Sequence, residues 1–180
     1  MLSLLPDYAD PLRLCALGKA YEGRVPLAEL PRLVPLLTSS VGEAAFTLAF
    51  DMDADRRPVV RVRVQAHLPV QCQRCLGPMD LEVDADARLV VVSGPDEAER
   101  LPDDVDPLLL EDAKIALRSL IEDELILAIP PAPTHVPEAC AVKVEAASGR
   151  ADEVLETAEA PADHPFAALA GWKSDRSESD

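Results

Sequence analysis

Two cysteines separated by two residues are the feature of this sequence with the clearest chemistry. Cys72 and Cys75 can bring two sulfur atoms close enough to share a metal ion or to form a disulfide. A second pair of candidate ligands, His135 and Cys140, lies 59 residues further along the chain, with four residues between its members. Three sulfurs and one imidazole nitrogen suit tetrahedral zinc. The sequence therefore predicts a structural zinc site that only the fold can assemble.

Other interpretations of the same cysteines remain open at this point. The four cysteines can all stay reduced, with Cys15 and Cys140 incidental. Cys72 and Cys75 can also serve a thiol-disulfide or metal-dependent enzyme. Reactive pairs of this kind sit at a helix N-terminus, where the helix dipole lowers the thiol pKa. Here the pair closes a predicted strand and Gly77-Pro78 follows, which favours a zinc-knuckle-like turn.

The sequence contains no further catalytic motif. It does contain one small basic cluster. The three histidines are dispersed, and no GxSxG, HExxH or glycine-rich phosphate loop occurs. Arg56, Arg57, Arg61 and Arg63 lie close together in the chain. They form either the solvated face of a sheet, paired with acids, or the surface that could contact RNA phosphates.

Charge and composition limit the classes of function. The 180 residues carry a formal charge of −16, and the first 70 residues are balanced, so the excess acid lies in the rest. Only six residues are aromatic. These values disfavour a general nucleic-acid binder, which needs clustered basic residues and stacking surfaces. No apolar run approaches the ~20 residues of a spanning helix, and no signal peptide is evident, so we expect a cytoplasmic protein.

The elements that must position these residues are mostly strands. Apolar and polar residues alternate over 44–52, 58–70 and 81–92, and 11–21 is a weaker strand candidate. Short links between them favour an antiparallel sheet or an open barrel. One main helix is predicted over 112–128, with Glu122, Asp123 and Glu124 near its exposed side. A second, N-terminal helix is predicted over 27–37. It should be short or irregular, because it contains two prolines.

The composition changes after Cys140. We therefore expect a β-rich α+β domain over 1–140, an acidic linker over 141–163 and a C-terminal motif with a polar tail over 164–180. The acidic C-terminal region is expected to be flexible. Within it, Phe166, Leu169 and Trp172 recur every three residues. This spacing predicts a short helix that binds a partner or the domain itself.

Four motifs in order resemble the bacterial YceD family of large ribosomal RNA subunit accumulation proteins, which also occurs in plastids. They are Val70–Leu76, Ile121–Pro130, Pro133–His135 with Cys140, and His164–Ala170. The resemblance covers roughly residues 10–173. His164 stands where relatives usually have Asn, and the ending Gly171-Trp172-Lys173 also departs from the family pattern.

The resemblance implies a non-enzymatic factor that supports synthesis, processing or stability of large-subunit (23S) ribosomal RNA. The implied partner is that RNA or a precursor of the large subunit, reached through basic ribosomal proteins that an acidic surface can attract. Arg74 lies within the first motif and joins the arginine cluster as a candidate RNA contact.

Overall fold

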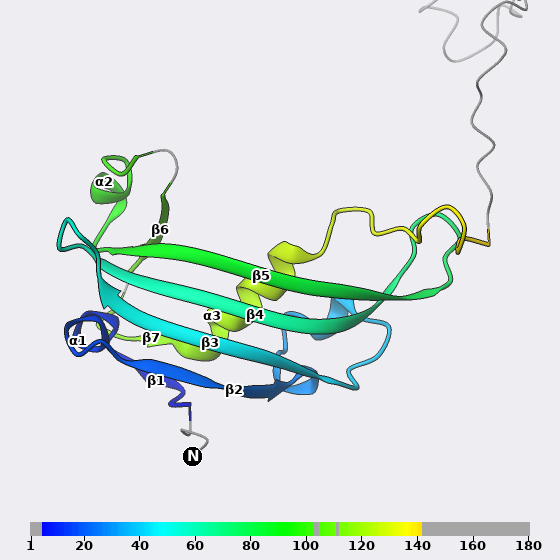
Figure 1. Ribbon diagram of the computed structural model, residues 1–180, viewed down its shortest axis with the longest axis horizontal. Helices are drawn as coiled ribbons and strands as arrows, with labels where there is room; N and C mark the ends of the chain where they lie inside the picture. The colour runs from blue at the N-terminus through cyan, green and yellow to red at the C-terminus, as the bar shows by residue number, and fades with distance from the viewer. Residues whose placement is uncertain (1–4, 103–104, 111, 142–180) are drawn as a thin grey trace, which may run out of the picture. The chain divides into compact units, whose positions relative to one another are not determined.

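The computed structural model describes residues 5–102, 105–110 and 112–141, and all structural statements below concern these residues. Seven strands, three α-helices and two 3-10 turns follow one another along this part of the chain (Figure 1). In chain order they are β1 (Tyr8–Ala9), α1 (Pro11–Ala16), β2 (Ala20–Pro26), η1 (Leu27–Glu29), η2 (Val34–Leu36), β3 (Glu43–Met52), β4 (Pro58–Gln71), β5 (Pro78–Val92), α2 (Pro95–Ala98), β6 (Asp106–Leu109), β7 (Ile115–Ala116) and α3 (Leu117–Ala128).

The main sheet has five strands in the order β2-β3-β4-β5-β6. The first four strands pair antiparallel, each with the next along the chain, while β6 pairs parallel with β5. A separate two-stranded pair joins β1 to β7. The predicted α+β class with a mainly antiparallel sheet is confirmed. The parallel edge strand was not predicted, because its four residues show no alternating pattern.

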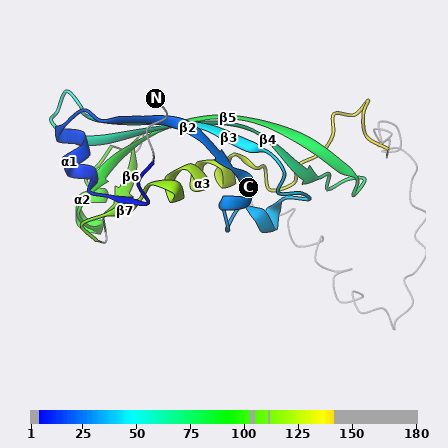
Figure 2. The ribbon, with the colours of Figure 1, turned by 90° about the horizontal axis from the view of Figure 1, so that it is seen from below.

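One face of the sheet holds the core. Along β4, Val60, Val62 and Val64 are buried and the arginines between them are exposed, as the alternation predicts. The long helix α3 crosses this inner face, and the sheet bends over it (Figure 2). The buried apolar stripe of α3 consists of Leu117, Leu120, Ile121 and Leu125. Burying each large aliphatic side chain contributes roughly 1.5–3 kcal/mol, so this layer supplies most of the stability.

The main helix begins five residues later than the sequence predicts. Ile115 and Ala116 extend as β7 and pair with β1, and the amide N–H of Leu117 donates to the carbonyl of Asp7 at 3.1 Å. A tertiary strand pairing therefore replaces the first turn of the predicted helix. The C-terminal end at Ala128 agrees with the prediction and precedes the prolines from Pro130 onward.

The predicted strand over 11–21 is wrong for most of its length. Residues Pro11–Ala16 form α1, and β2 begins only at Ala20. The side chain of Asp10 caps the helix by accepting from the N–H of Arg13 at 3.1 Å, and Pro11 occupies the first turn. This is a standard helix start, and it outweighs the weak alternation that suggested a strand.

Residues 27–37 form two separate 3-10 turns, η1 and η2, where a short or irregular helix was predicted. Pro31 and Pro35 have no backbone N–H, so a continuous helix would lose two hydrogen bonds there. Leu27 and Leu30, two of the apolar residues at helical spacing, are nevertheless buried, whereas Val34 and Leu37 are half-buried and Leu33 is buried instead.

Candidate metal centre

The cysteine pair lies in the tight connection between β4 and β5. Cys72 follows the last residue of β4, and its N–H donates to the carbonyl of Gly77 at 2.9 Å. The N–H of Leu76 donates back to the carbonyl of Cys72 at 2.8 Å, and Leu76 has a positive φ of 57°. These bonds close the loop on itself and bring the two sulfurs together.

The other two ligands come from the extended segment after α3. The prolines at 130, 131 and 133 prevent further helix, and the N–H of Gln73 donates to the carbonyl of Pro133 at 2.7 Å. A turn between His135 and Cys140 is marked by the bond from the N–H of Ala139 to the carbonyl of Val136 at 3.0 Å. The segment thus lies against the cysteine loop, although 59 residues separate the two halves in sequence.

The four predicted ligands meet in one cluster. The sulfurs of Cys72, Cys75 and Cys140 and a ring nitrogen of His135 all lie within 4.8 Å of one another. Zinc–sulfur bonds of about 2.3 Å in a tetrahedron place neighbouring ligands about 3.8 Å apart. The sulfur of Cys75 and Nδ1 of His135 are 3.4 Å apart. The cluster therefore has the ligand types, number and spacing that a tetrahedral metal ion requires.

Hydrogen bonding orients the imidazole of His135. Its Nε2 lies 3.1 Å from the carbonyl oxygen of Pro78, and a carbonyl only accepts hydrogen bonds, so Nε2 carries the proton. Nδ1 faces the sulfur of Cys75, and this contact raises the pKa of His135, so a metal would bind Nδ1 in place of a proton. A ligating histidine whose other nitrogen donates to a backbone carbonyl is the usual arrangement in protein metal sites.

The backbone around the cluster favours thiolates. Burial raises the pKa of Cys72, but N–H groups of Cys75, His135 and Arg74 that face its sulfur outweigh burial and lower the pKa to about 6. The N–H of Gly77 is the main cause that lowers the pKa of Cys75. Thiolates are the metal-binding form of cysteine, so the loop is prepared for a cation.

The same geometry does not resemble a reactive thiol site. Cys72 is fully buried, and the pair lies between two strands of the described chain instead of at the start of a helix. Cys15 lies away from the cluster. Its thiol donates to the carbonyl of Val59 at 3.3 Å, and burial raises its pKa, so this cysteine is part of the core.

The predicted RNA-contacting arginines separate into two places. Arg56, Arg57, Arg61 and Arg63 lie in the β3–β4 turn and on the adjoining half of β4. Arg74 lies in the cysteine loop at the other end of β4. Arg63 and Arg74 are eleven positions apart, with most of β4 between them, so the structure does not bring Arg74 to the others.

Glu122 was missed by the sequence interpretation. It is only 4% exposed, whereas the run of three acids had suggested a solvated face. Its carboxylate accepts from the N–H groups of Arg32 and Leu33 at 2.6 and 3.1 Å and from Nε of Arg32 at 3.0 Å. The expectation was wrong because Glu122 lies beside the buried apolar stripe of α3, where the connection between η1 and η2 covers it. The helical phase does not reveal this burial, because Glu122 is about 100° around the helix from Ile121.

The predicted partner-binding residues Phe166, Leu169 and Trp172 lie outside the described residues, as do the predicted tail over 164–180 and, apart from Ala141, the predicted linker over 141–163. Among the described helices, none has the length and apolar character needed to span a membrane.

Known proteins resemble this chain over most of its length. A family model described as "Large ribosomal RNA subunit accumulation protein YceD" matches residues 60–173, a range that contains all four ligands of the cluster. The Large ribosomal RNA subunit accumulation protein YceD of Haemophilus influenzae is 31% identical over 170 residues, which cover 94% of this chain and 96% of that protein. No solved structure matches the chain.

Proposed function

Because the chain belongs to the YceD family of large ribosomal RNA subunit accumulation proteins, we propose that it is a non-enzymatic ribosome biogenesis factor. It supports the synthesis, processing or stability of large-subunit (23S) ribosomal RNA. The observation that carries this proposal is the alignment with the Haemophilus influenzae protein over nearly the whole length of both chains. Such coverage relates the complete domain, and not one motif, to the family. We place the protein in the cytoplasm, where ribosomal subunits are assembled.

We propose a structural zinc ion for the cluster of Cys72, Cys75, His135 and Cys140. Four protein ligands leave no open position for water or substrate, which is typical of structural and not catalytic zinc. The ion would join the β4–β5 loop to the segment that follows α3. This segment has no regular secondary structure, so the four ligands are the strongest tie available to it.

The partner we propose is a precursor of the large ribosomal subunit, contacted in part through basic ribosomal proteins. The charge of −16 supports attraction to basic proteins. Phe166, Leu169 and Trp172 would supply an apolar contact from the C-terminal motif over 164–180, joined by a linker over 141–163 to the domain over 1–140. A pull-down with and without ribonuclease distinguishes the two kinds of contact, because RNA-mediated capture disappears on digestion.

The direct test of the function is genetic. Deleting the gene should lower the ratio of 23S to 16S RNA and reduce the large-subunit peak on a sucrose gradient, and the full chain supplied in trans should restore both. A normal ratio and a normal gradient in the deletion strain would contradict the proposed function.

The C-terminal motif has its own test. A chain lacking residues 164–180 should accumulate to the normal level yet restore less 23S RNA in the same strain. Full restoration by this shortened chain would remove the motif from the proposed mechanism while leaving the family role in place.

A further inference from the structure

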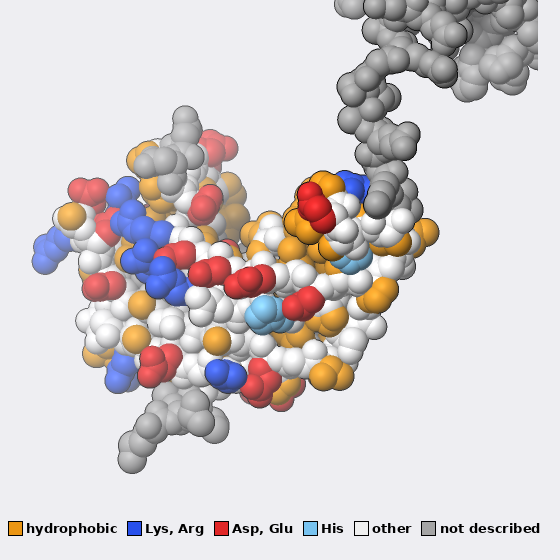
Figure 3. Space-filling model, turned by 45° about the vertical axis from the view of Figure 1, so that its right-hand side comes forward, with side chains coloured by type: hydrophobic (Ala, Val, Ile, Leu, Met, Phe, Trp, Pro, Cys, Tyr) orange, Lys and Arg blue, Asp and Glu red, His pale blue; other side chains and the backbone are white. Residues whose placement is uncertain are grey.

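Most of the face of the main sheet opposite α3 is not covered by any described element. At the end where β4 begins and β5 ends, Ala98, Leu101 and Val105 pack on Val59, Val90 and Val92 of this face. The charged side chains that point outward along β4 and β5 are exposed, and a group of basic side chains gathers on this face beside a row of acids (Figure 3). Residues 53–63 and 86–88 carry five arginines and three aspartates. An uncovered sheet face with a local excess of arginine can bind an extended polyanion.

Cross-strand pairing creates this basic group. Arg61 of β4 lies directly opposite Arg88 of β5, and Arg63 lies opposite Asp86. Two like charges opposite each other are unfavourable unless anions lie between them. Asp86 accepts from Nε of Arg61 at 2.9 Å and from Arg63 at 2.6 Å. Arg88 belongs to the surface only through the strand register, which the spacing of residues along the chain does not reveal.

A second aspartate fixes the neighbouring pair. Asp53 has a side chain only 6% exposed, and it accepts from Arg57 at 2.9 Å and from Arg88 at 3.2 Å. Each of these two aspartates therefore holds two guanidinium groups. Arginines that are already held lose less side-chain entropy when a ligand binds.

The held guanidinium groups keep donors free for a ligand. A guanidinium has five N–H donors, and with described residues Arg61 uses two, while Arg63 and Arg88 use one each. Their side chains are 66%, 58% and 52% exposed, respectively. A phosphate can therefore bind these arginines in addition to the aspartates and need not displace them.

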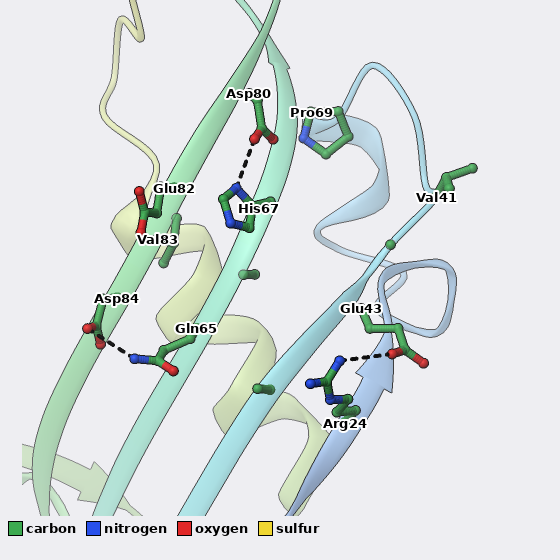
Figure 4. Close-up of a pocket in the computed structure, with 13 residues that line it drawn as sticks. Arg24, Val41, Glu43, Gln65, His67, Pro69, Asp80, Glu82, Val83 and Asp84 are labelled. Atoms are coloured by element: carbon green, nitrogen blue, oxygen red, sulfur yellow. Dashed lines mark hydrogen bonds and ion pairs between the residues drawn. The ribbon is translucent and has the colours of Figure 1, made fainter.

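The other end of the same face is acidic. A hollow of about 690 Å³ lies there, lined by Glu43, Asp80, Glu82 and Asp84 among others. Figure 4 shows Asp80 bound to His67, Asp84 bound to Gln65, and Arg24 bound to Glu43. Glu82 and Arg88 are six positions apart on β5, about 20 Å, which exceeds two Debye lengths at physiological salt. Glu82 is therefore largely screened from Arg88, whereas Asp84 lies two positions from Asp86 and so marks the boundary of the arginine end.

The outward face also lacks aromatic side chains. Of the aromatic residues in the described chain, Phe46 and Phe50 are buried in the core, Tyr21 packs against it, and Tyr8 lies outside the main sheet in β1. Without stacking platforms, contact through this face depends on phosphates and not on bases.

We infer that Arg61, Arg63 and Arg88, held by Asp86 and Asp53, form a docking surface for the RNA sugar–phosphate backbone. The inference rests on the proposed function, because RNA is the polyanion with which that function deals. It adds three things to that function: where RNA binds, that it binds the basic and not the acidic end of the face, and that binding does not depend on base sequence.

Binding of a labelled single-stranded RNA oligonucleotide of mixed sequence tests the inference on the full chain by fluorescence anisotropy. R61Q/R63Q/R88Q should weaken binding at least tenfold at moderate salt. It should also reduce the slope of log affinity against log salt by about 2, since each phosphate contact contributes about 0.7. Homopolymers of the four bases should bind the unchanged protein within about threefold of one another.

Two further variants control for charge and folding. The triple variant leaves Asp86 without its two arginine partners. In R61Q/R63Q/R88Q/D86N this charge is also removed, and binding should remain weak. E82Q/D84N changes the acidic end of the same face, and binding should stay equal or increase. Circular dichroism and thermal melting show whether each variant is folded.

The inference is overturned if the unchanged protein does not bind the probe, or if the triple variant keeps its affinity and salt slope. Wild-type RNA binding by the triple variant together with loss of a captured protein would assign the surface to a protein instead. The deletion strain reports on the proposed function independently, because its 23S level does not depend on where RNA binds.

Discussion

The two ends of β4 differ in the burial of the functional side chains beside them. At one end, Cys72 of the cysteine loop and Cys140 of the segment after α3 are both buried, and backbone N–H groups face the sulfur of Cys72. At the other end, Arg61 and Arg63 share an aspartate at the surface and remain more than half exposed. The buried end links segments distant in sequence and so supports the fold. The exposed end contributes little to stability, which leaves its side chains available for binding.

The largest difference between the ends should come from Cys72→Ser. Loss of one ligand should abolish stoichiometric zinc binding and lower the free energy of unfolding by about 3–5 kcal/mol. The reason is that the metal binds only the folded chain, so its binding free energy stabilises the fold. Metal analysis of protein purified without added zinc, followed by urea unfolding, measures both effects.

Cys15→Ser is the matched control, because this buried cysteine lies outside the cluster and its variant should keep the metal. A chelator added to the unchanged protein should lower its melting temperature. Unchanged protein without stoichiometric metal, or C72S that retains it, would contradict the zinc site.

Glu122 and Asp123 repeat the same contrast within one helix. Glu122→Gln should cost roughly 2–4 kcal/mol, since it removes a buried carboxylate that accepts from two backbone N–H groups and from Arg32. Asp123 also pairs with Arg32, at 2.7 Å, but its side chain is 46% exposed, so Asp123→Asn should cost at most about 0.5 kcal/mol. Equal losses in urea unfolding would show that burial does not decide the outcome.

Each end of β4 also adjoins a residue with positive φ that is not glycine. Arg56 has a φ of 60° and Leu76 a φ of 57°. Replacing either with Gly relieves about 1–2 kcal/mol of strain and costs about 0.5–1 kcal/mol of chain entropy. We therefore expect a gain of up to about 1 kcal/mol from Arg56→Gly and Leu76→Gly alike, measured by urea unfolding. A loss at both positions would argue against the left-handed conformation.

The smallest effect is expected from Asp86→Asn, and it should depend on pH. The hydrogen bond from Arg61 lowers the pKa of Asp86 in the folded protein, so its contribution is present above the ordinary Asp pKa and is lost as pH falls through the lowered value. The variant should melt no more than about 2 °C below the unchanged protein at neutral pH, and the difference should shrink in acid and vanish once the pH is below the lowered pKa of Asp86.

Melting curves from pH 2 to 7 check this expectation. Asp84→Asn is the matched control, because Asp84 accepts from the neutral side chain of Gln65 instead of an arginine. A difference that stays constant through the acid range would mean that the Asp86 carboxylate is not the source of the effect.

Local patterns predicted much of this molecule. Alternation located β3, β4 and β5, and the helical stripe located α3, because side-chain direction repeats with the backbone over a few residues. The thiol chemistry and tight spacing of Cys72 and Cys75 likewise identified half of the candidate metal centre. Residues 11–21 were misjudged because one capping bond at Asp10 decided a pattern that was weak by itself.

The sequence by itself therefore determined the main strands, the main helix, the chemistry of four candidate ligands and the resemblance to a family. Only the tertiary structure decided that His135 and Cys140 meet the cysteine loop, that Glu122 is buried, and that Arg88 joins Arg61 and Arg63. The physical reason is range. Periodicity reports which face a residue takes within its own element, whereas these three contacts depend on strand register and on the path of the chain after α3, which packing of the whole domain sets.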